Sequence, residues 1–211
     1  MKRAVIFDLD GVLVHTDKIH YAVWVELTEK LGIPFSPQVM DRVRGMSRMD
    51  SLEVVLSAGD RTWTQAEKES LAKEKNRAYV ARAGKMTSAD VEEDVWRTLD
   101  ALRARGVLLA VGSSSKNAPL ILERTGLGEK LDALADGNMI QRAKPDPEVF
   151  LRAAGLLGVA PGEAYVVEDA EAGIRAALDG GFTPVAFGGS AAASPLAAHR
   201  IDRLSQLTAL F

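Results

Sequence analysis

Two aspartates, Asp8 and Asp10, lie two residues apart directly after the apolar segment 4–7. The segment is typical of a buried strand, and side chains that alternate along a strand place both carboxyl groups on one face. Gly11 then allows a sharp turn. Carboxylates crowded at the end of a buried strand are costly unless a cation binds them, which predicts a metal site. Aspartates that only close a strand in a turn are the alternative.

Three later motifs also lie where strands are expected to end or helices to begin. Residues 112–117, GSSSKN, combine hydroxyls, backbone amides and an ammonium, which suit phosphate binding. A capped strand–helix turn would use the same residue types. Lys144 precedes a proline-rich helix start, where a solvated lysine is the alternative. Glu168 and Asp169 follow a further apolar segment and again indicate a cation site, with turn capping as the alternative.

The elements that must position these motifs change character along the chain. Strands are expected at residues 4–7, 107–111, 133–135, 164–167 and 184–187, and from residue 92 onward they alternate with helices. This alternation predicts βαβ units and a parallel sheet. Between them, residues 17–82 carry helical patterns, first at 17–31 and later around 52–56 and 65–82. An all-helical block is therefore inserted in an α/β domain, with hinges near 13–17 and 83–92.

The amino-acid composition excludes several classes of protein. The 211 residues are 47% hydrophobic and 26% charged, as in an ordinary globular protein. The net charge of -3 argues against a nucleic-acid partner. The chain contains no cysteine, in keeping with a reducing cytoplasm. Its first apolar run is too short for a signal peptide, and no run approaches a membrane span, so we expect a cytoplasmic protein without a membrane partner.

The four motifs in this order resemble the haloacid dehalogenase superfamily of phosphohydrolases and phosphomutases, and the resemblance covers the whole chain. It implies a Rossmann-like parallel-sheet core formed by residues 1–14 and 84–211. It also implies a helical cap domain formed by residues 15–83.

The resemblance assigns roles to individual residues. Asp8 would be the nucleophile that forms an aspartyl phosphate, and Asp10 the general acid/base. Ser113 and Lys144 would hold the transferring phosphoryl group. The expected cofactor is Mg²⁺, bound by Asp8, the main-chain carbonyl of Asp10, Glu168 and Asp169. Because an anionic nucleophile must approach an anionic phosphate, charge neutralisation by a metal and a lysine agrees with these roles.

The inserted block is similar to the cap of the β-phosphoglucomutases. Residues 44–53, RGMSRMDSLE, carry the strongest resemblance. It implies that Arg48 binds the distal phosphate of the substrate, and that His20 and Lys75 couple cap closure to the placement of Asp10. The expected substrate-binding residues are His20, Trp24, Gly45, Arg48, Ser51, Lys75, Ser113, Ser115, Lys116, Asn117 and Lys144.

Three positions depart from the family pattern. His15 stands where relatives commonly carry aspartate, although the retained Thr16 can still hydrogen-bond Asp10. The second hinge lacks a Pro-Gly turn around Glu92, and Ala170 replaces a frequent serine, which removes one hydrogen bond near the acidic pair.

The resemblance therefore predicts a Mg²⁺-dependent phosphomutase that interconverts β-glucose 1-phosphate and glucose 6-phosphate through β-glucose 1,6-bisphosphate. A sugar-phosphate phosphatase with the same core is the alternative among enzymes. A non-catalytic phosphosugar-binding protein is the alternative from another class. In each case the expected partner is a small sugar phosphate, and the chain is expected to be a monomer.

Overall fold

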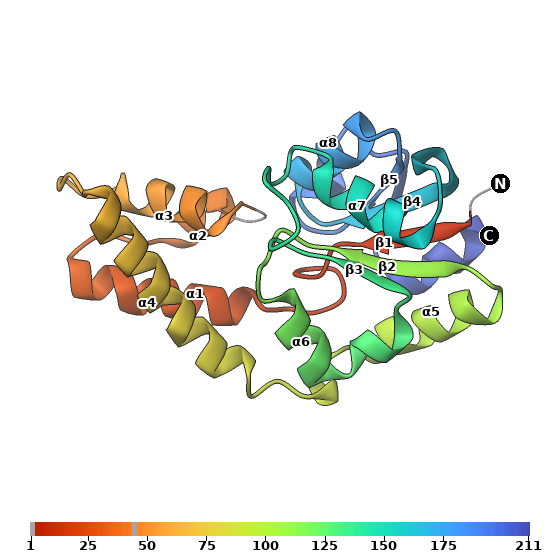
Figure 1. The fold of residues 1–211 in the computed structure, drawn as a ribbon, viewed down its shortest axis with the longest axis horizontal. Helices are drawn as coiled ribbons and strands as arrows, with labels where there is room; N and C mark the ends of the chain where they lie inside the picture. Colours follow the sequence, from red (N-terminus) through yellow and green to blue (C-terminus); the bar gives the residue numbers. More distant parts are fainter. Residues whose placement is uncertain (1–2, 44–45) are drawn as a thin grey trace.

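A parallel sheet of six strands forms the centre of one half of the molecule in the computed structural model, which describes residues 3–43 and 46–211 (Figure 1). The strands are β1 (Ala4–Phe7), β2 (Leu108–Gly112), β3 (Ala133–Ala135), β4 (Ala164–Glu168), β5 (Thr183–Phe187) and β6 (His199–Ile201), in the spatial order β3-β2-β1-β4-β5-β6. Strand β1 is central, and Phe7 lies in register with Val111 of β2 and Val167 of β4. The ends of β1 and β4 therefore meet at the same edge of the sheet.

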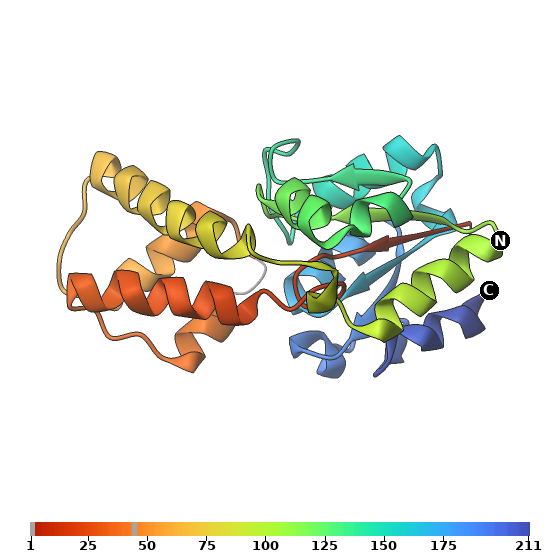
Figure 2. The ribbon, with the colours of Figure 1, turned by 90° about the horizontal axis from the view of Figure 1, so that it is seen from below.

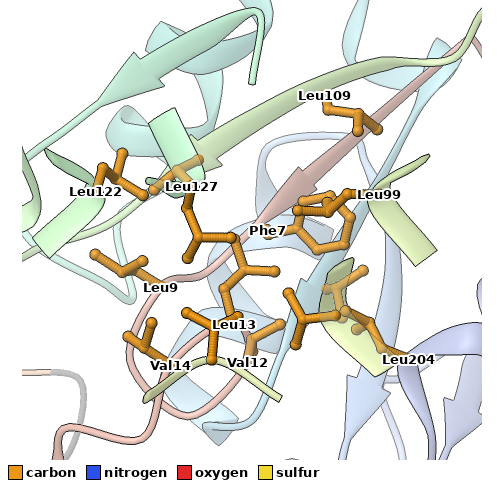
Figure 3. Packing of buried hydrophobic residues seen from close by; sticks show 14 of the residues in the cluster. Phe7, Leu9, Val12, Leu13, Val14, Leu99, Leu109, Leu122, Leu127 and Leu204 are labelled. Atoms are coloured by element: carbon orange, nitrogen blue, oxygen red, sulfur yellow. The ribbon is translucent and has the colours of Figure 1, made fainter. Parts of the chain in front are cut away.

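Helices cover both faces of this sheet, because side chains alternate between two hydrophobic clusters along β1. Val5 and Phe7 belong to one cluster, together with residues of α5 (Glu93–Ala104), α6 (Ala118–Thr125) and the C-terminal 3-10 helix Leu204–Leu210. Figure 3 shows Phe7 of this cluster packed near Leu99. Ala4 and Ile6 belong to the other, with α7 (Glu148–Leu157) and α8 (Glu171–Asp179). Burial on both faces explains the continuous apolar strands.

A block of four helices extends from one end of the sheet domain (Figures 1 and 2). Its helices are α1 (Asp17–Leu31), α2 (Pro37–Val43), α3 (Arg48–Leu56) and α4 (Gln65–Ala83). They enclose a separate hydrophobic cluster that includes Trp24, Leu52 and Leu71. We call this block the cap. Tyr79 and Ala83, near the end of α4, pack instead into the core of the sheet domain, so the cap is anchored at its base.

The predicted fold class, a Rossmann-like parallel sheet with an inserted helical cap, is confirmed. The two segments that connect the parts contain residues 13–16 and 84–92, close to the predicted hinges. The low-complexity segment 188–198 includes a short 3-10 helix, Ser190–Ala193. Within the described ranges, the structure contains no helix with the length and apolar character that crossing a membrane requires.

Candidate active site

Three carboxylates gather where β1 and β4 end. Asp8 continues β1, and its backbone N–H donates to Val167 O at 2.9 Å, which holds it beside Glu168 and Asp169. One carboxylate oxygen from each of the three acids lies within 4.8 Å of the other two, and all three residues are buried. Hard oxygen ligands at this separation are suited to Mg²⁺. The residues present thus fit the predicted metal.

Two glycines allow the acids to pack this closely. A Cβ atom at Gly11, whose φ is 98°, would lie 2.3 Å from Asp169 Oδ2. A Cβ atom at Gly173 would lie 1.9 Å from Glu168 Oε1. Both distances are shorter than any real Cβ contact, so a side chain at either position would displace a candidate metal ligand.

Lys144 reaches the same place from the segment before α7. Its Nζ lies 2.5 Å from both Asp8 Oδ1 and Glu168 Oε1, and it is buried with them. Burial alone would lower the pKa of the Lys144 ammonium, but the charges of Asp8 and Glu168 outweigh that effect and raise it. Lys144 therefore stays protonated and supplies a fixed positive charge beside the Asp8 carboxylate.

Asp10 lies on the tight turn that follows β1, where its backbone bridges to Val14. The Thr16 hydroxyl donates to Asp10 Oδ1, which confirms the predicted hydrogen bond. Burial, and then the negative charge of Asp8, raise the pKa of the Asp10 carboxyl to about 7. A carboxyl group with such a pKa can both release and accept a proton near neutral pH.

The loop 113–117 follows β2 and is held by its own hydroxyls. Ser113 Oγ accepts from the N–H of Ser115 at 3.1 Å, and Ser115 Oγ accepts from the N–H of Asn117 at 3.2 Å. These bonds stabilise turns within the loop, whereas α6 begins after Asn117 without a side-chain cap, so the capped turn considered from the sequence is not what the loop forms. Because a hydroxyl can accept and donate at once, both serines still carry an O–H donor for a ligand.

A cavity of about 640 Å³ lies between the cap and the sheet domain. The predicted site residues that line it are Asp8, Asp10, His20, Trp24, Arg48, Ser51, Lys75, Ser113, Ser115, Lys116, Asn117, Lys144, Glu168 and Asp169. Gly45, the remaining predicted residue, lies outside the described residues. The structure thus brings the other predicted residues to one cavity, from both halves of the molecule.

Lys75 projects from α4 into an aromatic corner of the cap. Its Nζ lies 2.9 Å from His20 Nδ1 and 4.8 Å from the centre of the Trp24 ring. Burial, and then repulsion by the nearby Arg48 guanidinium, lower the pKa of Lys75 to about 8. Burial also lowers the pKa of Arg48. Arg48 and Lys75 thus place two cationic side chains on the cap wall of the cavity, which also carries Asp17, Asp50 and Glu69.

Some residues that matter to the site were not among the predicted ones. Asn76 Oδ1 accepts from Asn117 Nδ2 at 2.9 Å, a hydrogen bond between the cap and the loop after β2. Gly137 lines the cavity, and a Cβ atom there would lie 2.3 Å from Ser114 O. Asn76, like Lys75, belongs to the sequence that resembles the cap of the β-phosphoglucomutases, but no role was predicted for it. Gly137 had no signal beyond its position after a strand.

The structure shows the contacts made at two of the positions that depart from the family pattern. His15 Nε2 lies 3.2 Å from Glu92 Oε1, so two exposed side chains connect the two hinge segments. The N–H of Ala170 donates to Glu168 Oε2 at 3.0 Å, so the backbone orients this carboxylate without a serine.

Comparison with known proteins agrees with this geometry. Residues 2–181 match the haloacid dehalogenase-like hydrolase family. A β-phosphoglucomutase of Bacillus subtilis is 39% identical over 188 residues, which cover 88% of this chain and 83% of the relative. A phosphorylated carbohydrates phosphatase of Thermotoga maritima is 28% identical, covering 85% of this chain and 82% of the relative.

The crystal structure of a β-phosphoglucomutase from Clostridium difficile superimposes with a TM-score of 0.91 at 34% identity, covering 98% of this chain and 93% of that one. The sequence relatives and the superimposed structure thus point to the same family as the acid–lysine cluster and the inserted cap. This chain belongs to the haloacid dehalogenase-like hydrolase family, as an enzyme of sugar-phosphate transfer similar to β-phosphoglucomutases.

Proposed function

We propose that the protein is a β-phosphoglucomutase that interconverts β-glucose 1-phosphate and glucose 6-phosphate. The observation that carries the proposal is a single cavity with a cation at each side: Lys144 beside Asp8 on the sheet domain, and Arg48 on the cap. A volume of about 640 Å³ is within the usual range for small-molecule sites. Two separated cations suit a substrate that carries a phosphate at both ends.

The chemistry begins with the Asp8 carboxylate, which attacks phosphorus and becomes an aspartyl phosphate. Lys144, 2.5 Å from Asp8 Oδ1, reduces the repulsion between the nucleophile and the phosphoryl oxygens. The hydroxyl of Ser113, which lines the cavity, completes the cradle for those oxygens. Asp10 donates a proton to the departing sugar oxygen, and later takes one from the sugar hydroxyl that attacks the phosphoenzyme.

The predicted metal would be held by Asp8, Glu168 and Asp169, whose oxygens lie within 4.8 Å of one another. A bound Mg²⁺ would polarise the phosphoryl group and neutralise charge that develops during transfer. Gly11 and Gly173 serve this arrangement because they leave the space that Asp169 and Glu168 occupy.

The cap residues would favour transfer of the phosphoryl group to a second sugar hydroxyl over its transfer to water. Arg48 would hold the non-reacting phosphate, so that the bisphosphate stays in the cavity while the other end reacts. The hydrogen bond between Asn76 and Asn117 fastens the cap to the loop 113–117 beside the cavity. A cap held there would help to exclude water from Asp8.

A coupled assay tests this function. The enzyme is given β-glucose 1-phosphate, Mg²⁺ and a glucose bisphosphate primer, and the formation of glucose 6-phosphate is measured beside the release of inorganic phosphate. Formation of glucose 6-phosphate that outpaces phosphate release supports the mutase. Phosphate release without isomerisation contradicts it.

A sugar-phosphate phosphatase is the second candidate, because a carbohydrate phosphatase of Thermotoga maritima is among the relatives. The same assay separates the two, since a phosphatase releases phosphate as its main product. A non-catalytic phosphosugar-binding protein would yield neither product, although it would still bind the substrate.

A further inference from the structure

A second hollow, of about 450 Å³, adjoins the cavity on the cap. Its lining consists of Arg48, Ser70, Lys73, Asn76 and Arg77. Ser70, Lys73 and Arg77 follow the helical spacing of three and four residues, so α4 presents them along one face. Arg48, Lys73 and Asn76 line both the hollow and the cavity, so the hollow lies directly beside the candidate active site.

The basic residues of α4 in this hollow differ in their ion pairing from other basic residues of the same helix. Lys68 pairs with Glu53 at 2.7 Å, and Arg82 pairs with Glu26. Among the described residues, no carboxylate lies within ion-pairing distance of Lys73 or Arg77.

Glu69 and Asp50, two acids of the cap that line the adjoining cavity, accept hydrogen bonds from neutral side chains and keep their negative charge. Glu69, one turn before Lys73, accepts from Gln65 Nε2 at 3.1 Å. Asp50 accepts from Ser47 Oγ at 2.6 Å. Lys73 and Arg77 line the hollow and form no ion pair among the described residues, so their charged groups are available to a ligand there.

The sheet domain presents the opposite charge. Asp8, Asp10, Glu168 and Asp169 line the sheet-domain side of the cavity with two lysines, Lys116 and Lys144, and the whole chain carries a net charge of -3. A phosphate dianion that approaches this side is repelled until the metal and the cap neutralise it. Cations at the entrance would raise the local concentration of such a ligand.

We propose that Lys73 and Arg77, with Ser70 and Arg48, form an entrance subsite for the phosphate group of a phosphomonoester. A planar guanidinium and an ammonium around a hydroxyl are the donors that bind phosphate oxygens best. This inference rests on the proposed function for its substrate class. Arg48 is shared with the proposed reaction, whereas Ser70, Lys73 and Arg77 have no role in it and would act before the substrate reaches Asp8.

Inorganic phosphate is a probe that does not depend on turnover. In Mg²⁺-free buffer of low ionic strength, a phosphate titration followed by amide NMR should shift the resonances of Ser70, Lys73 and Arg77. The double variant Lys73→Gln/Arg77→Gln should lose these shifts. The double variant Lys68→Gln/Arg82→Gln removes the same charge from the same helix and should keep them.

Kinetics with β-glucose 1-phosphate provide the second measurement. Removal of Lys73 and Arg77 should lower kcat/KM about tenfold at low salt, because electrostatic steering acts on association. At about 1 M salt, where the screening length falls to about 3 Å, the difference should nearly vanish.

Two results would overturn the subsite. One is a phosphate titration that shifts only the loop 113–117 and leaves Ser70, Lys73 and Arg77 unchanged. The other is an equal loss in the control variant, which would make the effect one of overall charge. If the protein binds phosphate at α4 but does not isomerise glucose phosphates, the subsite stands and the proposed function fails.

Discussion

At the scale of single residues, the site depends on one buried ion-pair cluster. Lys144 Nζ lies 2.5 Å from Asp8 and from Glu168, and the three side chains are almost inaccessible to solvent. Breaking a buried pair by removing one partner is destabilising, since it leaves an uncompensated charge. Lys144 has two carboxylate partners, so the loss of one charge at Asp8 still leaves it paired with Glu168. This arrangement allows the charge of Asp8 to be removed in an experiment while Lys144 keeps one carboxylate partner.

Asp8→Asn should therefore abolish turnover while the protein stays folded, because an amide cannot attack phosphorus. Incubation with the bisphosphate, followed by intact-mass spectrometry, should show a phosphoenzyme for the wild type and none for the variant. A melting curve measures folding independently. A covalently phosphorylated Asp8→Asn protein would show that another residue is the nucleophile.

Asp10→Asn should lower kcat by about 10²- to 10⁴-fold, since the variant cannot exchange a proton with the sugar oxygen. Asn has the same size and can still accept the hydrogen bond from Thr16, so the turn after β1 should persist. Steady-state kinetics of isomerisation measure the loss. A variant within about threefold of the wild type would assign the proton transfer to a different group.

At the scale of elements, α3 and α4 together determine the electrostatics of the cap. Arg48 begins α3, Lys75 lies in the middle of α4, and the repulsion between their charges lowers the pKa of Lys75 further than burial alone. His20 of α1 contacts the same ammonium at 2.9 Å. The pKa of Lys75 is therefore a property of three packed helices rather than of one residue.

Titration of Lys75, followed by NMR of its side-chain carbon next to Nζ, should give a pKa of about 8. Arg48→Gln should raise this pKa, because loss of a nearby positive charge favours the protonated amine. Between pH 8 and about 10.4, the unfolded chain binds the proton at Lys75 more tightly than the folded protein, so this group makes stability rise with pH. A midpoint that stays in place in Arg48→Gln would show that the two charges do not interact.

At the scale of the whole molecule, function depends on two bodies that share one cavity. The sheet domain carries the acids and Lys144, and the cap carries Arg48 and Lys75. The base of α4 packs into the core of the sheet domain, and Asn76 bonds to Asn117 across the cavity. In the proposed function, the sheet domain would carry the reaction centre and the cap would bind the second phosphate.

Arg48→Ala should lower isomerisation of β-glucose 1-phosphate by roughly 10- to 150-fold, since it removes a charge-assisted interaction with the distal phosphate. Hydrolysis of acetyl phosphate, which has no distal phosphate, should change little. Arg61→Ala, a cap variant outside the cavity lining, serves as the control. Equal losses in both reactions would mean that Arg48 supports the cap itself, and would favour the phosphatase.

Strands, helices and turns could be predicted from the sequence because they depend on residues that are neighbours in the chain. The apolar segment before Asp8 is strand β1, and the helical pattern of residues 17–31 is α1 with the same limits. The glycine after Asp10 indicated a turn, and its φ of 98° is one that L side chains rarely adopt. The short 3-10 helices are less evident from sequence, since three or four residues carry little periodicity.

The assembly of the site was decided by tertiary structure. Lys144 and Asp8 are 136 residues apart, and only the parallel register of β1 with β4 and the packing of α7 bring them to 2.5 Å. Residue types in these motifs, together with their family resemblance, predicted which residues would take part. Other features depend on distances between segments that are remote in the chain. They are the pairing of Lys144 with two acids, the hydrogen bond between Asn76 and Asn117, and the hollow beside Arg77. Hydrophobic patterning records which face of a segment is buried but not what it is buried against, so these contacts required the fold.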